Sequence, residues 1–260
     1  MNEEKQPLIL ISNDDGVFAK GLKVLVNAVK HLGQVVVVSP DKPQSGKGHC
    51  ITLDSPLWYR VSKSYDHDVL IYKCTGTPVD CIKLALLKIL DRKPDLILSG
   101  INHGSNSSIN VVYSGTLGAA IEGAIHNIPS IGFSILNFAP DADFDYASNY
   151  VTYIVENVLK LNKNKSLCLN VNIPYSEPEN IKGIKIVRQA KAYWDEYFQE
   201  NVHPYNHKSY YWLGGNFVNK EPDAEDTDEW ALANGYISIT PIQIDHTDYN
   251  EIKVLKQWNL

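Results

Sequence analysis

Apolar runs alternate with segments of helical spacing along the first two thirds of the chain. An uninterrupted apolar run within residues 7–12 is followed by residues 21–32, where apolar positions recur at helical spacing up to Gly33. A second uninterrupted run, within residues 34–39, is rich in β-branched side chains. Runs that are apolar on both faces are typical of central strands in a parallel sheet. The order strand, helix, strand therefore predicts a right-handed parallel unit.

The same alternation continues to about residue 175. Two shorter strands are expected over residues 53–61 and 68–74. The longer elements expected after them are a helix over 77–90, a strand over 95–99, a helix over 116–127, a strand over 129–135, a helix over 146–161 and a strand over 166–173. This pattern predicts an α/β fold of the Rossmann-like, doubly wound type, with a mostly parallel sheet in a three-layer αβα arrangement over residues 1–175.

Residues 176–260 have a different texture, and we expect them to complete the same domain and to mediate oligomerisation. Residues 193–212 hold eight aromatic side chains, which predicts an aromatic-rich β-hairpin that is either an interface or a rim for a nucleobase. Residues 221–229 hold six carboxylates, which is more typical of a solvated loop or a helix start than of a cation site. The remaining expected elements are a short helix over 230–234, a strand over 235–244 that Pro241 assigns to the sheet edge, and a terminal helix over 248–258.

Charge and composition narrow the function classes. A net charge of -6 over 260 residues argues against a polymeric nucleic acid as partner, because such proteins usually present a basic face. The four cysteines show no Cys-x-x-Cys spacing and are expected to be reduced thiols. No apolar run approaches the roughly 20 residues of a membrane-spanning helix, and the acidic start does not resemble a signal peptide. We expect no membrane partner and a cytoplasmic location.

Candidate chemistry gathers where the predicted strands end. Asp14 and Asp15 follow the first strand, Ser45 lies in the loop after the second, and Asn102 lies after the strand over 95–99. Because the carboxyl ends of parallel strands meet at one edge of the sheet, these side chains are expected to lie close together. Their oxygens are hard donors, which favour Mg²⁺ or Mn²⁺ over Zn²⁺. Taken singly, each group also fits an ordinary turn, such as an Asx turn closed by Gly16.

A second candidate feature precedes the helix over 116–127. Ser114, Gly115 and Thr116 would place backbone amides and hydroxyls at the positive end of the helix dipole, where a phosphoryl group could bind. Ordinary N-capping by Ser114 or Thr116 is the alternative, and both can hold at once. His49, His103 and His246 lie in loops or at a strand end, where a proton shuttle is plausible.

These residues carry a resemblance to a known family. The blocks ISNDDG (11–16), SGINHGSN (99–106) and YSGT (113–116), together with residues 39–52, 76–78 and 238–241, resemble the signature blocks of the SurE family of 5'-nucleotidases. The resemblance implies one divalent metal ion per subunit, bound at the positions of Asp14, Asp15, Ser45 and Asn102. It also implies hydrolysis of nucleoside monophosphates, and a homodimer or homotetramer with exchanged carboxyl-terminal segments.

The residues and the resemblance lead to one expected reaction, the hydrolysis of nucleoside 5'-monophosphates by metal-activated water. The expected catalytic residues are Asp14, Asp15 and Asn102. The expected substrate and phosphate contacts are Asn13, Ser45, Gly46, Ser114, Gly115 and Thr116.

Several other classes share parts of this pattern. A haloacid-dehalogenase-type phosphatase would need Asp-x-Asp after the first strand, whereas Asp14 and Asp15 are adjacent. A broad-specificity acid phosphatase stays open as a function. A receiver-like, Mg²⁺-binding phosphoacceptor module is about half this length and needs an aspartate at the end of its third strand, where this chain has Asn102. A nicotinamide dehydrogenase would need Gly-x-Gly-x-x-Gly, which residues 13–18 do not supply.

Overall fold

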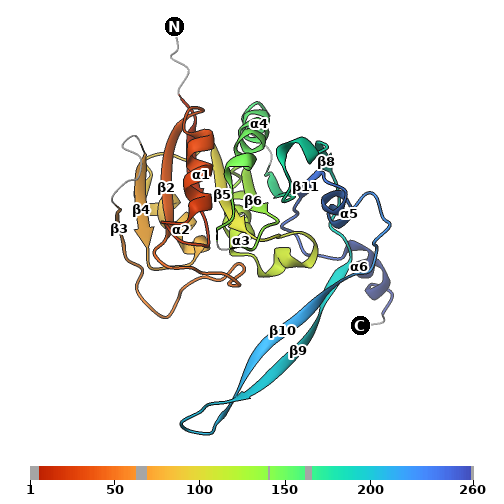
Figure 1. Cartoon of the computed structure of the whole chain (residues 1–260). Coiled ribbons are helices and arrows are strands. Elements are labelled where there is room, and N and C mark those ends of the chain that lie inside the picture. The colour runs from red at the N-terminus through yellow and green to blue at the C-terminus, as the bar shows by residue number, and fades with distance from the viewer. Residues whose placement is uncertain (1–5, 63–68, 140, 162–165, 259–260) are drawn as a thin grey trace.

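The computed structural model describes residues 6–62, 69–139, 141–161 and 166–258. A nine-stranded sheet forms the centre of the molecule, in the order β3-β4-β2-β1-β5-β6-β7-β11-β8 (Figure 1). The six strands from β4 to β7 are parallel, and β3 and β11 join them antiparallel. The strands are β1 (Leu8–Ser12), β2 (Gln34–Pro40), β3 (Tyr59–Val61), β4 (Leu70–Cys74), β5 (Leu96–His103), β6 (Ser130–Ile135), β7 (Cys168–Ile173), β8 (Ile184–Ile186) and β11 (Ile237–Pro241).

Helices cover both faces of this sheet and bury its apolar side chains. On one face Ile9 and Ile11 of β1 pack with buried residues of α1 (Lys20–Val29) and α4 (Ser148–Leu159). On the other face Leu8 and Leu10 pack with α2 (Pro78–Leu84) and α3 (Gly115–Ile125). A π-helical turn (Ala85–Ile89) continues α2. The predicted three-layer α/β fold is therefore confirmed.

The strand order fixes where a ligand can bind. From β1 the chain passes to β2 and β4 on one side of the sheet, and β5, β6 and β7 then add on the other side of β1. The winding direction thus reverses between β1 and β5, and in such sheets a crevice opens outside the carboxyl ends of those two strands. Asp14 follows β1 and Asn102 lies at the end of β5, so both belong to this crevice.

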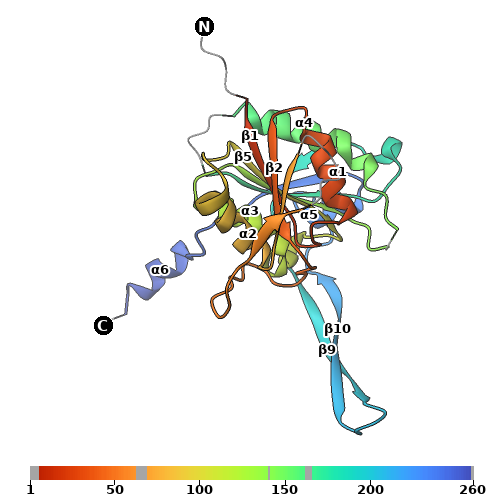
Figure 2. The same cartoon turned by 90° about the vertical axis from the view of Figure 1, so that its left-hand side faces the viewer.

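The carboxyl-terminal part adds β8 and β11 to the central sheet and also forms a separate two-stranded sheet. The predicted aromatic hairpin is confirmed as β9 (Ala192–Val202) paired with β10 (Ser209–Asn219), and it projects from the core (Figures 1 and 2). Two further helices follow, α5 (Asp228–Ala233) and α6 (Tyr249–Leu255). Helix α6 buries none of its residues and stands apart from the core in Figure 2.

Some predicted details are wrong. Strand β11 is not at the sheet edge as Pro241 suggested, because it lies between β7 and β8. The proline is tolerated there because β8 pairs with β11 only up to Ile239, so Pro241 does not have to donate a hydrogen bond to β8. The strand expected over 53–61 is reduced to β3, and the start of the strand expected over 68–74 lies outside the described residues. The loop expected after residue 99 begins later, since β5 runs on to His103 and a 3₁₀ helix, η2, spans Ser108–Tyr113.

Within the described residues, no helix combines the length and the apolar character that crossing a bilayer requires.

A candidate active site at the switch point

Asp14 is the most buried carboxylate of the predicted set. Its side chain is 4% exposed, and Thr116 Oγ1 donates a hydrogen bond to its Oδ1 at 2.5 Å. Burial, and secondly the charge of Asp15, raise the pKa of Asp14 to about 6. Gly115 is required here, because a Cβ at this position would lie 2.9 Å from the Cβ of Asp14. Asp14 therefore lies directly against the start of α3.

Asp15 is more accessible than its neighbour. Burial raises the pKa of its carboxyl, while a hydrogen bond from the backbone N–H of His103 opposes this shift. Two adjacent carboxylates at one strand end repel each other in their charged forms, and a cation bound between them would remove that repulsion. Asp14 lines the pocket described below, whereas Asp15 is not among its lining residues.

The loop after β2 is hydrogen-bonded to Asp14 and to η2. The backbone N–H of Gln44 donates to the Asp14 carbonyl at 2.7 Å, and the N–H of Gly48 donates to the Tyr113 carbonyl at 3.0 Å. These bonds bring the predicted Ser45 and Gly46 to the pocket wall. His49 continues the loop and lies with its Nε2 3.0 Å from Glu122 Oε2 of α3.

Asn102 is placed by an irregularity in β5. The register between β5 and β6 shifts between Ser99 and Asn102. Gly100, with φ of +125°, permits this bulge, since a Cβ there would lie 2.4 Å from the Phe133 carbonyl oxygen. The amide of Asn102 donates from Nδ2 to the Gly104 carbonyl at 2.8 Å, so its Oδ1 is the end left to accept or to bind a cation.

Of the remaining predicted phosphate contacts, one lines the pocket and two hold neighbouring residues in place. Ser114 lines the pocket and also caps α3, because its Oγ accepts from the Leu117 N–H at 3.1 Å. Thr116 is buried and contacts Asp14 instead of the cavity. Asn13 is fully buried; it donates to the Gly16 carbonyl at 3.0 Å and accepts from Ser39 Oγ at 2.5 Å. Asn13 thus shapes the turn that carries the carboxylates.

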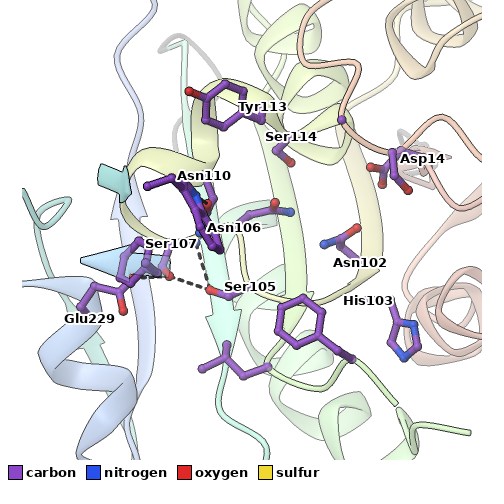
Figure 3. Close-up of a pocket in the computed structure, with 16 residues that line it drawn as sticks. Asp14, Asn102, His103, Ser105, Asn106, Ser107, Asn110, Tyr113, Ser114 and Glu229 are labelled. Carbon is purple, nitrogen blue, oxygen red and sulfur yellow. Dashed lines mark hydrogen bonds between the residues drawn. The ribbon is translucent and has the colours of Figure 1, made fainter. Parts of the chain in front are cut away.

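A cavity of about 550 Å³ lies against five of the predicted residues, Asp14, Ser45, Gly46, Asn102 and Ser114 (Figure 3). Asp14, Asn102 and His103 lie together on one side of it, and Glu229 lies on the opposite side. Its lining is formed by Asp14, Ser45, Gly46, Asn102, His103, Ser105, Asn106, Ser107, Asn110, Tyr113, Ser114, Leu136, Phe138, Trp194, Phe217 and Glu229. Of the three histidines considered as proton shuttles, His103 is the one that lines this cavity.

Several lining residues were not predicted from the sequence. Asn106 is held by the next strands: its N–H donates to Asn172 Oδ1 at 2.8 Å, and its Nδ2 donates to Ser134 Oγ at 2.9 Å. Asn170 Nδ2 also donates to the Asn106 carbonyl at 2.8 Å. The sequence did contain a sign of these contacts, because Asn170 and Asn172 are the polar positions of a strand that is otherwise apolar and wholly buried.

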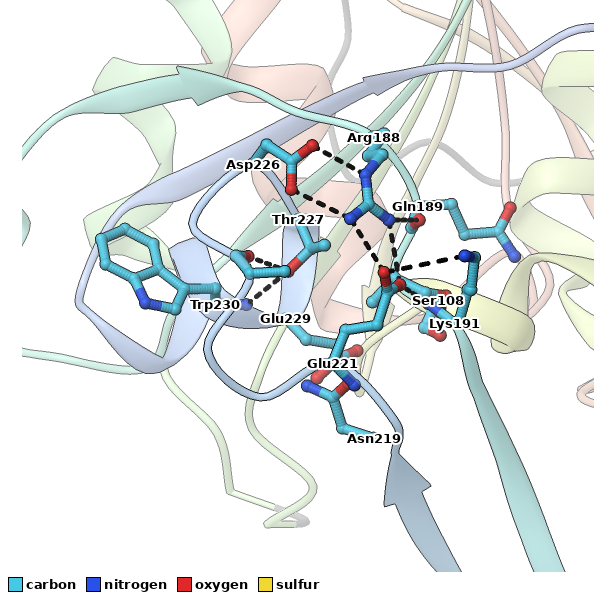
Figure 4. A network of polar contacts seen from close by, with 12 residues as sticks. Ser108, Arg188, Gln189, Lys191, Asn219, Glu221, Asp226, Thr227, Glu229 and Trp230 are labelled. Carbon is cyan, nitrogen blue, oxygen red and sulfur yellow. Dashed lines mark hydrogen bonds and ion pairs between the residues drawn. The ribbon is translucent and has the colours of Figure 1, made fainter.

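The acidic segment is the main correction to the expected site. Residues 221–229 are expected to form a solvated loop or a helix start, and the helix start is confirmed, because Asp228 and Glu229 form the first turn of α5. The expected solvation is wrong for these two residues, because Asp228 is fully buried and Glu229 lines the cavity. Asp228 accepts from the N–H of Ser108 at 2.7 Å and from the N–H of Ala190 at 2.9 Å. The earlier, exposed part of the segment is paired as well: Arg188 binds both Glu221 and Asp226 (Figure 4).

The described residues contain no group of three or more His, Cys, Asp or Glu side chains that could hold a metal ion. The predicted donor set does not need one, since it combines the two carboxylates of Asp14 and Asp15 with the hydroxyl of Ser45 and the amide oxygen of Asn102. Hard oxygen donors of this mixed kind suit Mg²⁺ or Mn²⁺, which commonly keep several waters. The residues present therefore fit a divalent metal ion.

The chain is similar in sequence to known proteins. The family described as Survival protein SurE matches residues 9–196 of the chain. A protein of Christiangramia forsetii named 5'-nucleotidase SurE is 50% identical over 260 residues, covering 99% of this chain and 98% of its own. A protein of Bacteroides fragilis with the same name is 50% identical over 258 residues, covering 99% and 100%.

A solved structure is also similar. The crystal structure of a SurE protein from Aquifex aeolicus superposes with a TM-score of 0.80 at 41% sequence identity, covering 96% of this chain and 98% of that one. With a family match over more than half the chain and relatives of this identity over nearly all of it, the chain belongs to the SurE family.

Proposed function

We propose that this protein is a metal-dependent phosphomonoesterase that hydrolyses nucleoside 5'-monophosphates to nucleoside and phosphate. The observation that carries the proposal is the pair Asp14 and Asp15 at the switch point of the sheet, beside the start of α3 and a cavity of about 550 Å³. A cavity of this size accommodates a ligand as large as a nucleotide. The relatives' name, 5'-nucleotidase SurE, supports the same reaction.

The metal would be held by Asp14, Asp15, Ser45 and Asn102, one ion per subunit. A bound Mg²⁺ or Mn²⁺ supplies a water of lowered pKa and offsets the charge of the phosphoryl group. The raised pKa of Asp14 supports a cation here, because a carboxylate that is buried beside another carboxylate becomes easier to ionise when positive charge is bound.

The chain's own groups have separable roles in this reaction. One carboxylate, Asp14 or Asp15, orients the attacking water. The hydroxyls of Ser45 and Ser114 and the first turn of α3 hold phosphate oxygens, because backbone N–H groups at a helix start attract anions. His103, on the same side of the cavity, donates the proton to the leaving 5'-oxygen. Asn102 would offer its Oδ1 to the metal, because its Nδ2 donates to the Gly104 carbonyl.

The surface supports an assembly of identical subunits. The hairpin β9–β10 exposes aromatic side chains such as Trp212 and Phe198, and α6 exposes Val254 and Leu255. Apolar side chains gathered on two projecting elements are typical of interfaces. A homodimer or homotetramer that exchanges its carboxyl-terminal elements would bury both. The four free cysteines fit a reducing cytoplasm as the place of action.

Removal of the metal tests the proposal. Protein treated with a chelator and then freed of it should release no phosphate from nucleoside 5'-monophosphates, and added Mg²⁺ or Mn²⁺ should restore the release. The measurement is phosphate release over a set of nucleoside monophosphates and simple phosphomonoesters. Full activity in the presence of the chelator would contradict the metal site and would favour a metal-independent reaction through a covalent phosphoenzyme. Equal activity on all phosphomonoesters would favour a broad-specificity phosphatase.

A further inference from the structure

The two ends of the cavity differ in chemistry. The end near Asp14 carries Asn102, His103 and the start of α3, which suits a phosphate and a metal ion. The opposite side carries the carboxylate of Glu229 (Figure 3). An aromatic pair from the hairpin, Trp194 and Phe217, also lines the cavity, and Trp194 is bonded to Asn110. If the proposed function holds, the phosphate occupies the first end and the nucleoside extends toward the second.

The aromatic pair is held in a defined orientation. Trp194 and Phe217 face each other across the hairpin, with ring centroids 5.6 Å apart in an edge-to-face arrangement. The indole Nε1 donates to Asn110 Oδ1 of η2 at 2.9 Å, which ties the tryptophan to the cavity wall. Rings fixed in this way offer an apolar surface to any base without reading its identity.

Glu229 is tied to the cavity wall through one oxygen. Ser107 Oγ donates to Glu229 Oε1 at 2.5 Å, and Ser107 is itself in contact with Ser105 Oγ at 2.6 Å. A carboxylate has further acceptor sites beyond the one that Ser107 occupies. The cavity lining contains no Lys or Arg, so the charge of Glu229 meets no cationic side chain among these residues.

This arrangement selects what can lie against Glu229. A phosphate group would be repelled by the carboxylate, since both are anionic and no side-chain cation lies between them. A group that donates hydrogen bonds is favoured, because a carboxylate is an acceptor and such charge-assisted bonds are the stronger kind. A nucleoside carries donors of two sorts, the ribose hydroxyls and the exocyclic amino group of a base.

We propose that Glu229 is a specificity-determining residue, which accepts a hydrogen bond from the nucleoside of the substrate while Trp194 and Phe217 contact its base. The carboxylate thereby also fixes the direction of the nucleotide, with its phosphate toward Asp14. This inference rests on the proposed function and adds the group that distinguishes a nucleotide from a simple phosphomonoester.

The test compares Glu229→Gln with the wild-type chain. Glutamine keeps an oxygen for Ser107 but loses the charge, so the wall of the cavity is preserved. The matched control is Glu225→Gln, which removes one charge from an exposed position of the same segment. Thermal unfolding of both variants checks that they fold.

Kinetics with Mn²⁺ present give the first readout. In Glu229→Gln, kcat/KM for adenosine 5'-monophosphate should fall about tenfold, mostly through KM, and it should fall further than kcat/KM for p-nitrophenyl phosphate. The control should keep the wild-type ratio between the two substrates. An equal fall in kcat/KM for both substrates would mean that Glu229 only keeps the cavity wall in place, and it would overturn the inference.

Substrate analogues distinguish the two donors. If a ribose hydroxyl is the donor, the wild type should favour the ribonucleotide over its 2'-deoxy or 3'-deoxy analogue, and Glu229→Gln should lose that preference. If the amino group of the base is the donor, the wild type should favour adenosine 5'-monophosphate over inosine 5'-monophosphate, and Glu229→Gln should lose that preference. Either loss supports the inference, and a variant that keeps all the wild-type preferences overturns it.

Binding of adenosine, which has no phosphate, gives a second readout that does not depend on catalysis. Calorimetry should show binding about tenfold weaker in Glu229→Gln than in the control. Equal binding in both would overturn the inference and leave the proposed hydrolysis intact. If the wild type releases phosphate from neither substrate, the proposed function itself is wrong and this inference falls with it.

Discussion

At the scale of single residues, the carboxyl of Asp14 combines function with a cost in stability. It is 4% exposed, and burial beside Asp15 raises its pKa to about 6 from an ordinary 3.8. An acid whose pKa is raised on folding binds its proton more tightly in the folded chain. The contribution of Asp14 to the free energy of unfolding of the metal-free protein is therefore fully present below the unfolded pKa, and it is lost as pH rises from about 4 to about 6.

This cost predicts that Asp14→Asn stabilises the metal-free protein at neutral pH. Asparagine stays neutral, so at pH 7 the variant should gain on the order of 3 kcal/mol in the free energy of unfolding, and the gain should vanish below about pH 4. Urea denaturation across this pH range, with chelator present, measures it. Asp223→Asn, at an exposed position, is the control and should show no such trend. A variant less stable than the wild type at pH 7 would contradict the account.

At the scale of elements, η2 is held by a segment far along the chain. Ser108, which begins η2, is fully buried and has a φ of 51°, a conformation that side chains rarely adopt. Asp228 accepts its N–H at 2.7 Å, and Ser108 Oγ donates to the Ala190 carbonyl at 2.8 Å. The cavity wall formed by Ser107, Asn110 and Tyr113 thus depends on the start of α5.

Asp228→Asn should therefore weaken the hydrogen bonds that hold η2 in the cavity wall. One end of the amide becomes a donor that faces the N–H of Ser108 or Ala190, so a buried N–H loses its acceptor at a cost of about 1–3 kcal/mol. Guanidinium denaturation measures the loss, and the KM for a nucleotide should rise with it. The matched control is Asp226→Asn, whose exposed pair with Arg188 should matter little. A loss in the control as large as in Asp228→Asn would refute the assignment.

The sequence predicted the strands and helices of the core well, because their apolar patterns are local. It also predicted that Asp14 and Asn102 share one edge, since parallel topology brings strand ends together. It did not predict the use of Asp228 and Glu229, because their burial depends on contacts about 120 residues away in the chain. A run of carboxylates reads as solvated until the backbone N–H groups that it satisfies are known.

At the scale of the whole molecule, two projecting elements are largely exposed within the described chain. Helix α6 has no buried residue, and most side chains of the hairpin β9–β10 are exposed. Both elements stand away from the core in Figure 2. A seven-residue helix is too short to be stable alone in water, because helix formation needs packing of an apolar face. We therefore propose that α6 packs against another subunit.

A chain that ends at Thr247 should accordingly form a smaller assembly. Size-exclusion chromatography with light scattering would show a lower mass per particle than for the full chain. Replacing the polar Asn250 and Glu251 by alanine in the full chain is the control, because it keeps the apolar residues of α6. An unchanged mass for the shortened chain would remove α6 from the interface and leave the hairpin as the remaining candidate.

The most direct test of the central claim is phosphate release from a nucleoside 5'-monophosphate by the wild type and by Asp14→Asn, each with saturating Mg²⁺ or Mn²⁺. The account predicts steady turnover by the wild type and a loss of at least about a hundredfold in the variant, although the variant folds at least as stably. Full activity in Asp14→Asn, or no phosphate released by the wild type with either metal, would contradict it.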